Sequence, residues 1–342
     1  MGMKIIKGFL FPFAIIYGLI VMIRNTLFDS GILKEHQILK PSIGVGNLSS
    51  GGTGKSVVVD YLICLLKEKY SLVVLSRGYK RNTKGVVVGS HESNAASLGD
   101  EPFQFMKKHP EISVVVAEKR VLGIQKIDKI AKKDSVILLD DVMQHRYVKP
   151  SLMILTSTFE TPYFSDQILP VGSLRESKKG SKRADIILIT KCPENMKQEQ
   201  IHFFKEKLSL EKHQQLFFTS IGYSTHIQNT SRSVSLKKIS NPFLLITGIA
   251  EPKPLLVFLN EKQLIFEHLS YPDHHNFNSS DIAHIQKRRG DKMILTTEKD
   301  YTRLSHLIED ENVYYLPIKM EFINHEDQIL FDKTIQNSIK LS

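Results

Sequence analysis

The segment V-G-N-L-S-S-G-G-T-G-K-S at residues 45–56 constrains the fold more than any other part of the chain. An apolar start breaks into a glycine-rich loop, and glycines let backbone N–H groups turn towards phosphate oxygens without Cβ clashes. The lysine can reach the β- and γ-phosphates, and the final serine hydroxyl can bind Mg²⁺ at the start of the next helix. The residues expected around the phosphates are Ser49, Ser50, Gly51, Gly52, Thr53, Gly54, Lys55 and Ser56.

Only the second half of the strict pattern G-x-x-x-x-G-K-[ST] is present, because its first glycine falls on Ser49. A glycine- and serine-rich turn is therefore the alternative. The flanking sequence favours the phosphate loop. Residues 43–46 predict a short strand and residues 57–66 an apolar helix, so the loop lies between strand and helix as this chemistry requires.

A second acidic element follows about ninety residues later. The run S-V-I-L-L at residues 135–139 predicts a buried strand, and it ends in Asp140 and Asp141. A nucleotide-binding fold of this kind places a Mg²⁺-holding carboxylate at such a strand end. A strand that merely leads into a turn is the alternative for this run alone. Together with the glycine-rich loop, it predicts binding of a nucleoside triphosphate.

The rest of the chain alternates short apolar runs with charged, helical stretches, which predicts a mostly parallel sheet covered by helices. The 342 residues suffice for a P-loop core at 35–222 and a smaller α/β lobe at 223–342, after an N-terminal segment at 1–34. Residues 198–215 are expected to be helical. The expected strands are 72–75, 86–88, 113–116, 136–139, 152–155, 186–189, 243–246, 262–268, 292–296 and 313–316.

The N-terminal segment predicts contact with a membrane. Residues 8–23 are uncharged and strongly apolar, with lysines before them and Arg24 after them. Sixteen residues fall short of the roughly 20 that cross a bilayer as a helix, and Pro12 lies near the start. A cleaved signal peptide would need a small-residue cleavage site, which is absent after this run, and a core helix would carry a polar face. We therefore expect a membrane-dipping or barely spanning anchor.

The net charge of +10 suits an anionic lipid surface or substrate. Nucleic acid is the competing partner, but the sequence holds no recognisable nucleic-acid motif and its basic residues are scattered. The two cysteines, Cys64 and Cys192, form no C-x-x-C pattern, so neither a disulfide framework nor a structural zinc site is expected. We expect no nucleic-acid partner.

Several short phrases occur in an order that resembles one known family. The phrases are S-R-G-Y-K at 76–80, G-D-E-P at 99–102, D-D-x-x-Q-H-R at 140–146, L-P-x-G-x-L-R-E at 169–176, G-I-A-x-P at 248–252, Y-P-D-H-H at 271–275 and T-E-K-D at 297–300. With these phrases in this order, the chain resembles the tetraacyldisaccharide 4′-kinases, the lipid A biosynthetic kinases of Gram-negative bacteria, over nearly its whole length.

The resemblance implies an α/β fold with a P-loop and ATP-dependent phosphorylation of the 4′-hydroxyl of a tetraacylated glucosamine disaccharide 1-phosphate. The product would be lipid IV-A, with ATP as phosphoryl donor and Mg²⁺ as cofactor. It also implies a place at the cytoplasmic face of the inner membrane. No obligate protein partner is inferred.

The same resemblance assigns roles by position. Asp100 matches the catalytic aspartate and His274 the histidine that works with it, while Lys55, Ser56, Asp140 and Asp141 match the phosphate and metal groups. Other polar positions expected around the phosphates and substrate are Asn47, Arg77, Glu101, Arg175 and Glu176.

The chemistry of these residue types agrees with those roles. A sugar hydroxyl has a high pKa, so a nearby aspartate must accept its proton, and an imidazole can orient that aspartate. On local sequence alone, D-E-P at 100–102 equally suits a helix N-terminus, and D-H-H at 273–275 a polar turn or metal site.

The sequence departs from the family at two places. Val142-Met143 stand where the family usually has Gly-Phe, and serines occupy positions 49 and 50 where it often has Thr-Val. The first change is expected to affect a turn and the second to leave the backbone function of the loop intact.

Two other function classes stay open on the residues alone. A GTPase would carry D-x-x-G after the metal strand, but Met143 stands at the glycine position, and T-K-C-P at 190–193 lacks the guanine-binding aspartate. A membrane-tethered NTPase or ATP-binding adaptor would keep the loop without lipid kinase activity. ATP turnover only in the presence of an acylated disaccharide separates the kinase from both.

Overall fold

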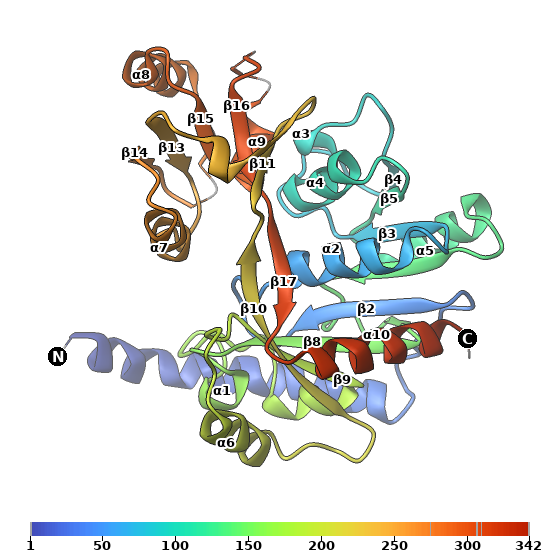
Figure 1. The fold of residues 1–342 in the computed structure, drawn as a ribbon. Helices are drawn as coiled ribbons and strands as arrows, with labels where there is room; N and C mark the ends of the chain where they lie inside the picture. Colours follow the sequence, from blue (N-terminus) through green and yellow to red (C-terminus); the bar gives the residue numbers. More distant parts are fainter. Residues whose placement is uncertain (1, 274, 306, 309, 341–342) are drawn as a thin grey trace.

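The chain forms two α/β lobes and a long N-terminal helix, α1 (Gly2–Asp29) (Figure 1). This computed structural model describes residues 2–273, 275–305, 307–308 and 310–340, with side chains from residue 9 onward. In Figure 1 the first lobe occupies the lower and right parts of the view, and the second lobe lies at the upper left. In this view α1 passes behind the lower part of the first lobe.

The first lobe is built on a large sheet with nine strands in the described part of the chain. The strand order is β17-β10-β9-β8-β2-β6-β3-β5-β4, and every neighbouring pair is parallel except the outermost pair at each edge. This mixed α/β architecture confirms the predicted fold class. The strands are β2 (Ser42–Asn47), β3 (Leu72–Ser76), β4 (Val87–Val88), β5 (Ser113–Val116), β6 (Val136–Asp140), β8 (Leu152–Thr158), β9 (Ile186–Thr190), β10 (Gln215–Tyr223) and β17 (Ile318–Phe322).

Helices cover both faces of this sheet, and the central strands are buried on both sides. Alternation along β2 sends Ile43 and Val45 into the core beneath α2 and α10. Gly44 and Gly46 point to the other face, where a Cβ would lie 2.7 Å from Val142 Cγ1 and 2.6 Å from Met143 Cβ, respectively. The helices are α2 (Lys55–Leu66), α3 (Ala95–Leu98), α4 (Asp100–Lys108), α5 (Arg120–Ile130), α6 (Gln198–Leu208) and α10 (His325–Lys340).

The second lobe has its own six-stranded sheet in the described residues, in the order β12-β11-β16-β15-β13-β14. The four strands from β13 to β16 pair parallel with one another and bury a separate apolar core, whereas β11 pairs antiparallel with both β16 and β12. The strands are β11 (His226–Gln228), β12 (Ser233–Ser235), β13 (Phe243–Thr247), β14 (Phe266–Ser270), β15 (Ile294–Thr297) and β16 (Val313–Leu316). The helices are α7 (Lys253–Glu261), α8 (Ser279–Arg289) and α9 (Glu298–Leu304).

The chain crosses between the lobes through two neighbouring strands. It leaves the first sheet along β10 and returns along β17, and the two strands pair antiparallel from Tyr223↔Ile318 to Thr219↔Phe322. α10 then packs Phe331, Ile335 and Ile339 against the first sheet. The sequence division at 222/223 falls at the outward crossing and stays a prediction; the segment 318–340 lies on the first lobe.

Short elements complete the fold. A small parallel pair, β1 (His36–Gln37) and β7 (Val148–Lys149), lies outside the main sheets. Three short 3₁₀ helices are found in the described residues, at Tyr163–Ser165, Lys178–Arg183 and Leu236–Lys238.

Two sequence expectations for local structure are wrong. The helix predicted over 198–215 ends at Leu208, because Ser209 adopts a left-handed conformation (φ 45°), and the next residues lead into strand β10. The strand predicted at 262–268 begins later, at Phe266, because α7 extends to Glu261 and is followed by a tight turn.

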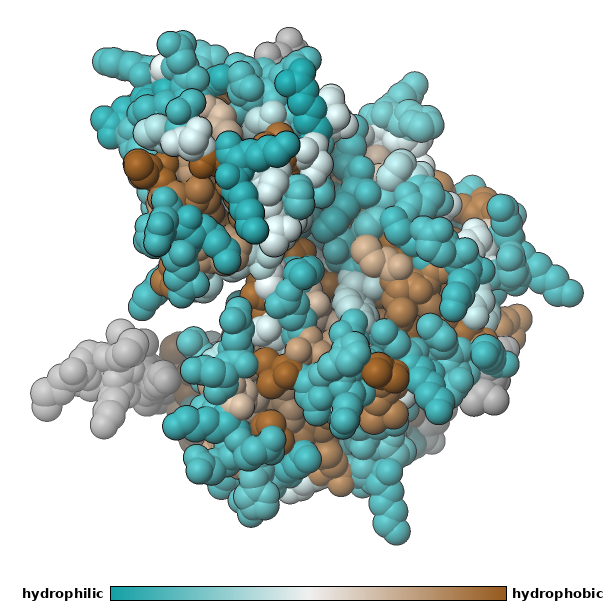
Figure 2. All heavy atoms as spheres, in the orientation of Figure 1, coloured by the Kyte–Doolittle hydropathy of each residue, from teal (hydrophilic) through white to brown (hydrophobic). Residues whose placement is uncertain are grey.

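α1 exposes a continuous apolar surface. From residue 9 the helix is long and apolar enough to cross a membrane by length and composition. Figure 2 shows a mostly hydrophilic face with scattered hydrophobic patches, whereas the exposed apolar side chains of α1 follow one another along the helix. The exposed apolar side chains of α1 are Phe9, Phe11, Phe13, Ile15, Ile16, Leu19, Ile20, Met22 and Ile23.

Candidate active site

The glycine-rich loop joins the end of β2 to the start of α2 at the centre of the large sheet. Gly54 adopts φ 80° immediately before the helix, a conformation that favours glycine. The buried hydroxyls of Thr53 and Thr156 lie 2.7 Å apart and hold the loop against β8. Within the described residues, the backbone N–H groups of Gly52, Gly54 and Lys55 donate to no protein acceptor. The loop therefore presents open donors at a helix N-terminus, the arrangement that binds phosphate.

Asn47 and Arg175 stabilise the loop through hydrogen bonds: Asn47 bonds the loop, and Arg175 bonds Asn47. Asn47 is fully buried at the end of β2, and its Nδ2 donates to the Gly51 carbonyl at 3.4 Å. Arg175 donates from Nη2 to both the side-chain and the main-chain oxygen of Asn47, the latter at 3.0 Å. Ser50 is tied to the same segment, because its N–H donates to the Ser173 carbonyl at 2.6 Å.

Asp141 lies beside the lysine of the loop. Lys55 Nζ is 3.5 Å from Asp141 Oδ1, and Arg175 donates to both carboxylate oxygens at 2.9 and 3.1 Å. Burial opposes ionisation of Asp141, but hydrogen bonds from Arg175 and the charge of Lys55 outweigh it and hold its pKa below the usual range. Asp141 is therefore a fixed negative charge next to the loop.

Asp140 lies in a different environment at the end of β6. It is 2% exposed, and its Oδ2 accepts a hydrogen bond from the Ser76 hydroxyl at 2.9 Å. Its Oδ1 is buried without a hydrogen-bond partner in the described part of the chain. Burial, followed by the negative charges of Glu101 and Asp141, raises the pKa of Asp140 to about 7. An unsatisfied buried carboxylate oxygen among other acids is the kind of group that a divalent cation satisfies.

Asp100 and Glu101 open α4 on the side of the site that faces the second lobe. Glu101 Oε1 accepts from the Ser56 hydroxyl at 2.5 Å and from Lys299 Nζ at 3.2 Å. Burial opposes ionisation of Glu101, but the charge of Lys299 and the hydrogen bond from Ser56 outweigh burial and lower the pKa of Glu101. Asp100 Oδ2 accepts from Arg303 Nη2 at 2.5 Å. Both acids thus meet cations of the second lobe.

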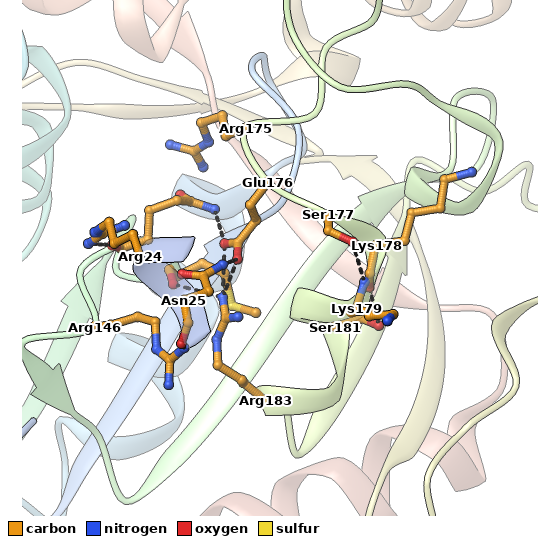
Figure 3. Close-up of polar contacts among 12 residues, drawn as sticks. Arg24, Asn25, Arg146, Arg175, Glu176, Ser177, Lys178, Lys179, Ser181 and Arg183 are labelled. Carbon is orange, nitrogen blue, oxygen red and sulfur yellow. Dashed lines mark hydrogen bonds and ion pairs between the residues drawn. The ribbon is translucent and has the colours of Figure 1, made fainter. Parts of the chain in front are cut away.

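Glu176 and Arg77 are placed differently from each other. Glu176 is 2% exposed, and its carboxylate accepts hydrogen bonds from Arg183, Gln144 and Asn25 at 2.8 to 3.0 Å (Figure 3). It thereby joins α1 to the segment that carries Arg175. Arg77 is exposed at the end of β3.

Sequence reasoning missed several residues of this neighbourhood. Gln144 donates to the Asn47 carbonyl at 2.8 Å and so connects the loop to Glu176. Burial, then the positive charges of Arg120 and Arg77, lowers the pKa of His145 to about 4, so this imidazole is neutral at physiological pH. Both residues stand in the phrase Q-H-R next to the acidic pair, and that position is the signal that could have found them.

His274, the predicted partner of Asp100, lies outside the described residues. The other predicted site residues lie at or just after the carboxyl ends of β2, β3 and β6, at the starts of α2 and α4, and on the segment between β8 and β9 that carries Arg175 and Glu176. This edge of the sheet gathers amide donors, two cations and four carboxylates within one polar neighbourhood. It can bind a polyanion with a divalent cation and present a carboxylate to a hydroxyl group.

Comparison with known proteins identifies the family. The family described as Tetraacyldisaccharide-1-P 4′-kinase (LpxK) matches residues 6–339. The chain belongs to the tetraacyldisaccharide-1-phosphate 4′-kinase family. This confirms the predicted family, the enzyme class and the place in lipid A biosynthesis.

Relatives and a solved structure agree along the whole length. A tetraacyldisaccharide 4′-kinase of Flavobacterium johnsoniae is 47% identical over 99% of this chain and 98% of its own. One of Bacteroides thetaiotaomicron is 40% identical over 94% of this chain and 90% of its own. A crystal structure of LpxK from Aquifex aeolicus, titled an "apo" form in complex with ATP, has a TM-score of 0.79 and 29% identity, and the match covers 98% of this chain and 99% of that one.

The departure at Val142-Met143 has a structural explanation within this member of the tetraacyldisaccharide 4′-kinase family. Asp141 takes a left-handed conformation (φ 48°), and the next two side chains are buried against Gly44 and Gly46 of β2. The turn therefore directs both acids towards the loop while the apolar pair fills the space that the glycines leave.

Proposed function

We propose that this kinase transfers the γ-phosphoryl group of ATP to the 4′-hydroxyl of a tetraacylated glucosamine disaccharide 1-phosphate, forming lipid IV-A, at the edge of the large sheet. The observation that carries this proposal is the open phosphate loop, whose Lys55 lies 3.5 Å from Asp141, next to the unsatisfied Oδ1 of Asp140. The ATP described for the A. aeolicus relative supports the choice of nucleotide.

The loop binds the triphosphate in this proposal. The N–H groups of Gly52, Gly54 and Lys55 donate to phosphate oxygens, and Lys55 Nζ neutralises charge on the transferring group. Arg175 and Asn47 keep the loop in shape through the hydrogen bonds between them. Ser49, Ser50, Gly51 and Thr53 complete the loop.

The donor set fits Mg²⁺. Asp140 offers a buried carboxylate oxygen without a protein partner in the described chain, and Ser56, Asp141 and Glu101 offer further oxygens beside the loop. When bound, Mg²⁺ supplies positive charge to the phosphates. Its charge also favours the ionised form of Asp140, whose pKa burial and neighbouring acids raise to about 7.

Asp100 accepts the proton of the sugar hydroxyl. It lies at the start of α4, and Arg303 donates to one of its oxygens, which orients the carboxylate. His274 is proposed as its partner on the strength of the family resemblance alone.

We also propose that α1 lies in the cytoplasmic face of the inner membrane and brings the kinase to its acylated substrate. The exposed apolar side chains of α1 supply the driving force, at roughly 25 cal/mol per Å² buried. Replacing Phe9, Phe13 and Ile20 by serine should release much of the protein from membranes, since these side chains are 77%, 63% and 61% exposed and support no core. Equal membrane partition of this variant and the wild type would remove the proposal.

Labelled-phosphate transfer tests the reaction itself. Purified protein is incubated with γ-labelled ATP, Mg²⁺ and the tetraacyl disaccharide 1-phosphate in detergent, and the labelled product is mapped. We expect the label at the 4′-position of the lipid only. ATP hydrolysis without transfer to the lipid, or label elsewhere on the sugar, would overturn the assignment.

A further inference from the structure

Helix α4 of the first lobe and helix α9 of the second lobe contact each other where the two lobes meet (Figure 1). In the part of the chain that the structure describes, three ion pairs join them, which we call the interlobe ladder. They are Asp100–Arg303 at 2.5 Å, Glu101–Lys299 at 3.2 Å and Lys108–Glu298 at 2.8 Å.

The charges along the two helices are complementary. α4 has its acids in the first turn and Lys108 in its last turn, while α9 begins with Glu298 and carries Arg303 in its last turn. Arg303 and Glu298 are each 8% exposed. Pairs shielded from water in this way are more sensitive to loss of a partner than exposed surface pairs, which contribute little. The ladder therefore constrains how the lobes meet.

Arg303 is held on its own side by a buried carboxylate. Asp300 is fully buried and accepts from the Gly248 N–H at 2.8 Å and the Thr297 hydroxyl at 2.7 Å. Its other oxygen accepts from Arg303 Nη1 at 3.4 Å. The guanidinium thus bridges Asp300 of its own lobe and Asp100 of the other, so its orientation is fixed at both ends.

The first two pairs end on proposed site groups, whereas the third does not. Lys299 shares the Glu101 carboxylate with Ser56 of the phosphate loop. Lys108 instead bonds Glu298 and Asp60, and Asp60 lies midway along α2 rather than in the loop. The ladder therefore combines two contacts that can affect chemistry with one that only joins the lobes.

We propose that Arg303 and Lys299 are positioning residues for phosphoryl transfer, which hold the carboxylates of Asp100 and Glu101 in their working orientation from the second lobe. This inference rests on the proposed role of Asp100 as the base. Arg303 acts through Asp100, so its removal lowers kcat and leaves ATP binding at the loop nearly unchanged. Lys299 has the smaller effect, since its pair is about one-third exposed.

The test compares Arg303→Met and Arg303→Lys in the full-length protein, with Glu298→Gln and Arg289→Met as controls. Glu298→Gln removes an interlobe pair but leaves Lys108 its partner Asp60. Arg289→Met removes a similarly buried arginine that pairs with Asp310 inside the second lobe. The measurements are kcat and KM for ATP at saturating lipid, and Tm.

We expect Arg303→Met to lower kcat about 10- to 100-fold, within the range of general-base effects, with KM for ATP changed less than about 3-fold. Arg303→Lys should recover part of this loss because it restores the charge without the fork of donors. Both controls should keep kcat within about 3-fold of wild type. An equal loss of kcat in Arg303→Met and Glu298→Gln would reduce the ladder to a lobe contact and overturn the inference.

A double-mutant cycle with Asp100→Asn separates this inference from the proposed function. If Arg303 acts through Asp100, Arg303→Met costs little further activity once Asp100 is Asn. An undiminished, multiplicative loss in that background would overturn the positioning role. If the single variant Asp100→Asn kept wild-type kcat, the proposed role of Asp100 as the base would be overturned. If Asp100→Asn were inactive while Arg303→Met kept wild-type kcat, only the positioning role of Arg303 would be overturned.

Discussion

Each lobe of this protein has a glycine-containing turn from a parallel strand into a helix. A backbone N–H of the turn in the second lobe is hydrogen-bonded within the protein, whereas three N–H groups of the turn in the first lobe are not, within the described residues. In the second lobe, the Gly248 N–H after β13 donates to the buried Asp300 at 2.8 Å. In the first lobe, the N–H groups of Gly52, Gly54 and Lys55 find no acceptor within the described chain. Since unsatisfied backbone groups cost free energy, the open turn is kept for a ligand and the closed turn for structure.

The largest expected difference concerns the first residue of the helix after each turn. Lys55 begins α2 and Lys253 begins α7. Lys55→Ala should lower phosphoryl transfer by about 10³-fold with an unchanged fold, because it removes positive charge at the triphosphate. Lys253→Ala, at an exposed position, should leave turnover within about 2-fold. Steady-state kinetics and circular dichroism of both variants check this, and wild-type turnover in folded Lys55→Ala would remove the phosphate-loop assignment.

Replacing Gly54 or Gly248 by alanine should impair different properties of the protein, ATP binding in the first case and stability in the second. Gly54 has φ 80° with ordinary space around a Cβ, whereas a Cβ on Gly248 would lie 2.9 Å from Asp300 Oδ1. Gly54→Ala should therefore weaken ATP binding by about 10-fold or more through backbone strain at the loop. Gly248→Ala should lower the free energy of unfolding by about 1–3 kcal/mol and leave ATP affinity unchanged.

Equilibrium ATP binding and urea unfolding of the two glycine variants measure both quantities. The contrast between the two turns would be wrong if Gly248→Ala weakened ATP binding as much as Gly54→Ala does. It would also be wrong if neither variant changed ATP binding.

The smallest effect concerns two buried aspartates, Asp140 and Asp300. The pKa of Asp140 is raised to about 7, so the folded state keeps this proton between about pH 4 and 7 while the unfolded state loses it. Stability from this group is therefore complete at low pH and is lost as the pH rises to about 7. Asp140→Asn should stabilise the ligand-free protein by about 1–2 kcal/mol at pH 8 and have no such effect near pH 4.

Urea unfolding in the presence of a chelator at both pH values tests this prediction. Asp300→Asn is the matched variant and should destabilise the protein, because the Asp300 oxygens accept from Gly248, Thr297 and Arg303. A loss of stability in Asp140→Asn at pH 8 would show that this carboxylate is satisfied in the folded state.

Local pattern predicted the open turn well. The expected strand at 43–46 and helix at 57–66 correspond to β2 (Ser42–Asn47) and α2 (Lys55–Leu66), because the apolar periodicity and the glycines lie within one short segment. The acids after β6 followed from the same reasoning. These features depend on neighbours in sequence, which is why the residues alone sufficed.

Features that depend on distant partners were not predicted. β10 (Gln215–Tyr223) was not predicted as a strand, and the predicted helix ended on its first residue, because its pairing with β17 joins residues about a hundred positions apart. The interlobe ladder was equally hidden, because D-E-P is typical of a helix start and T-E-K-D carries no local sign of a partner in the other lobe. The place of Glu176 around the phosphates and the substrate stays a prediction; the sequence did not show that its carboxylate accepts from donors of three other segments.

The antiparallel pairing of β10 with β17 makes the second lobe an insertion into a hairpin. Tyr223 and Ile318 are direct partners, so the lobe begins and ends at adjacent points of one ladder. A module with such close ends can be exchanged, shortened or lost without moving the register of the host sheet. The register of the large sheet thus does not depend on the second lobe, whereas the orientation of Asp100 and Glu101 does, through Arg303 and Lys299.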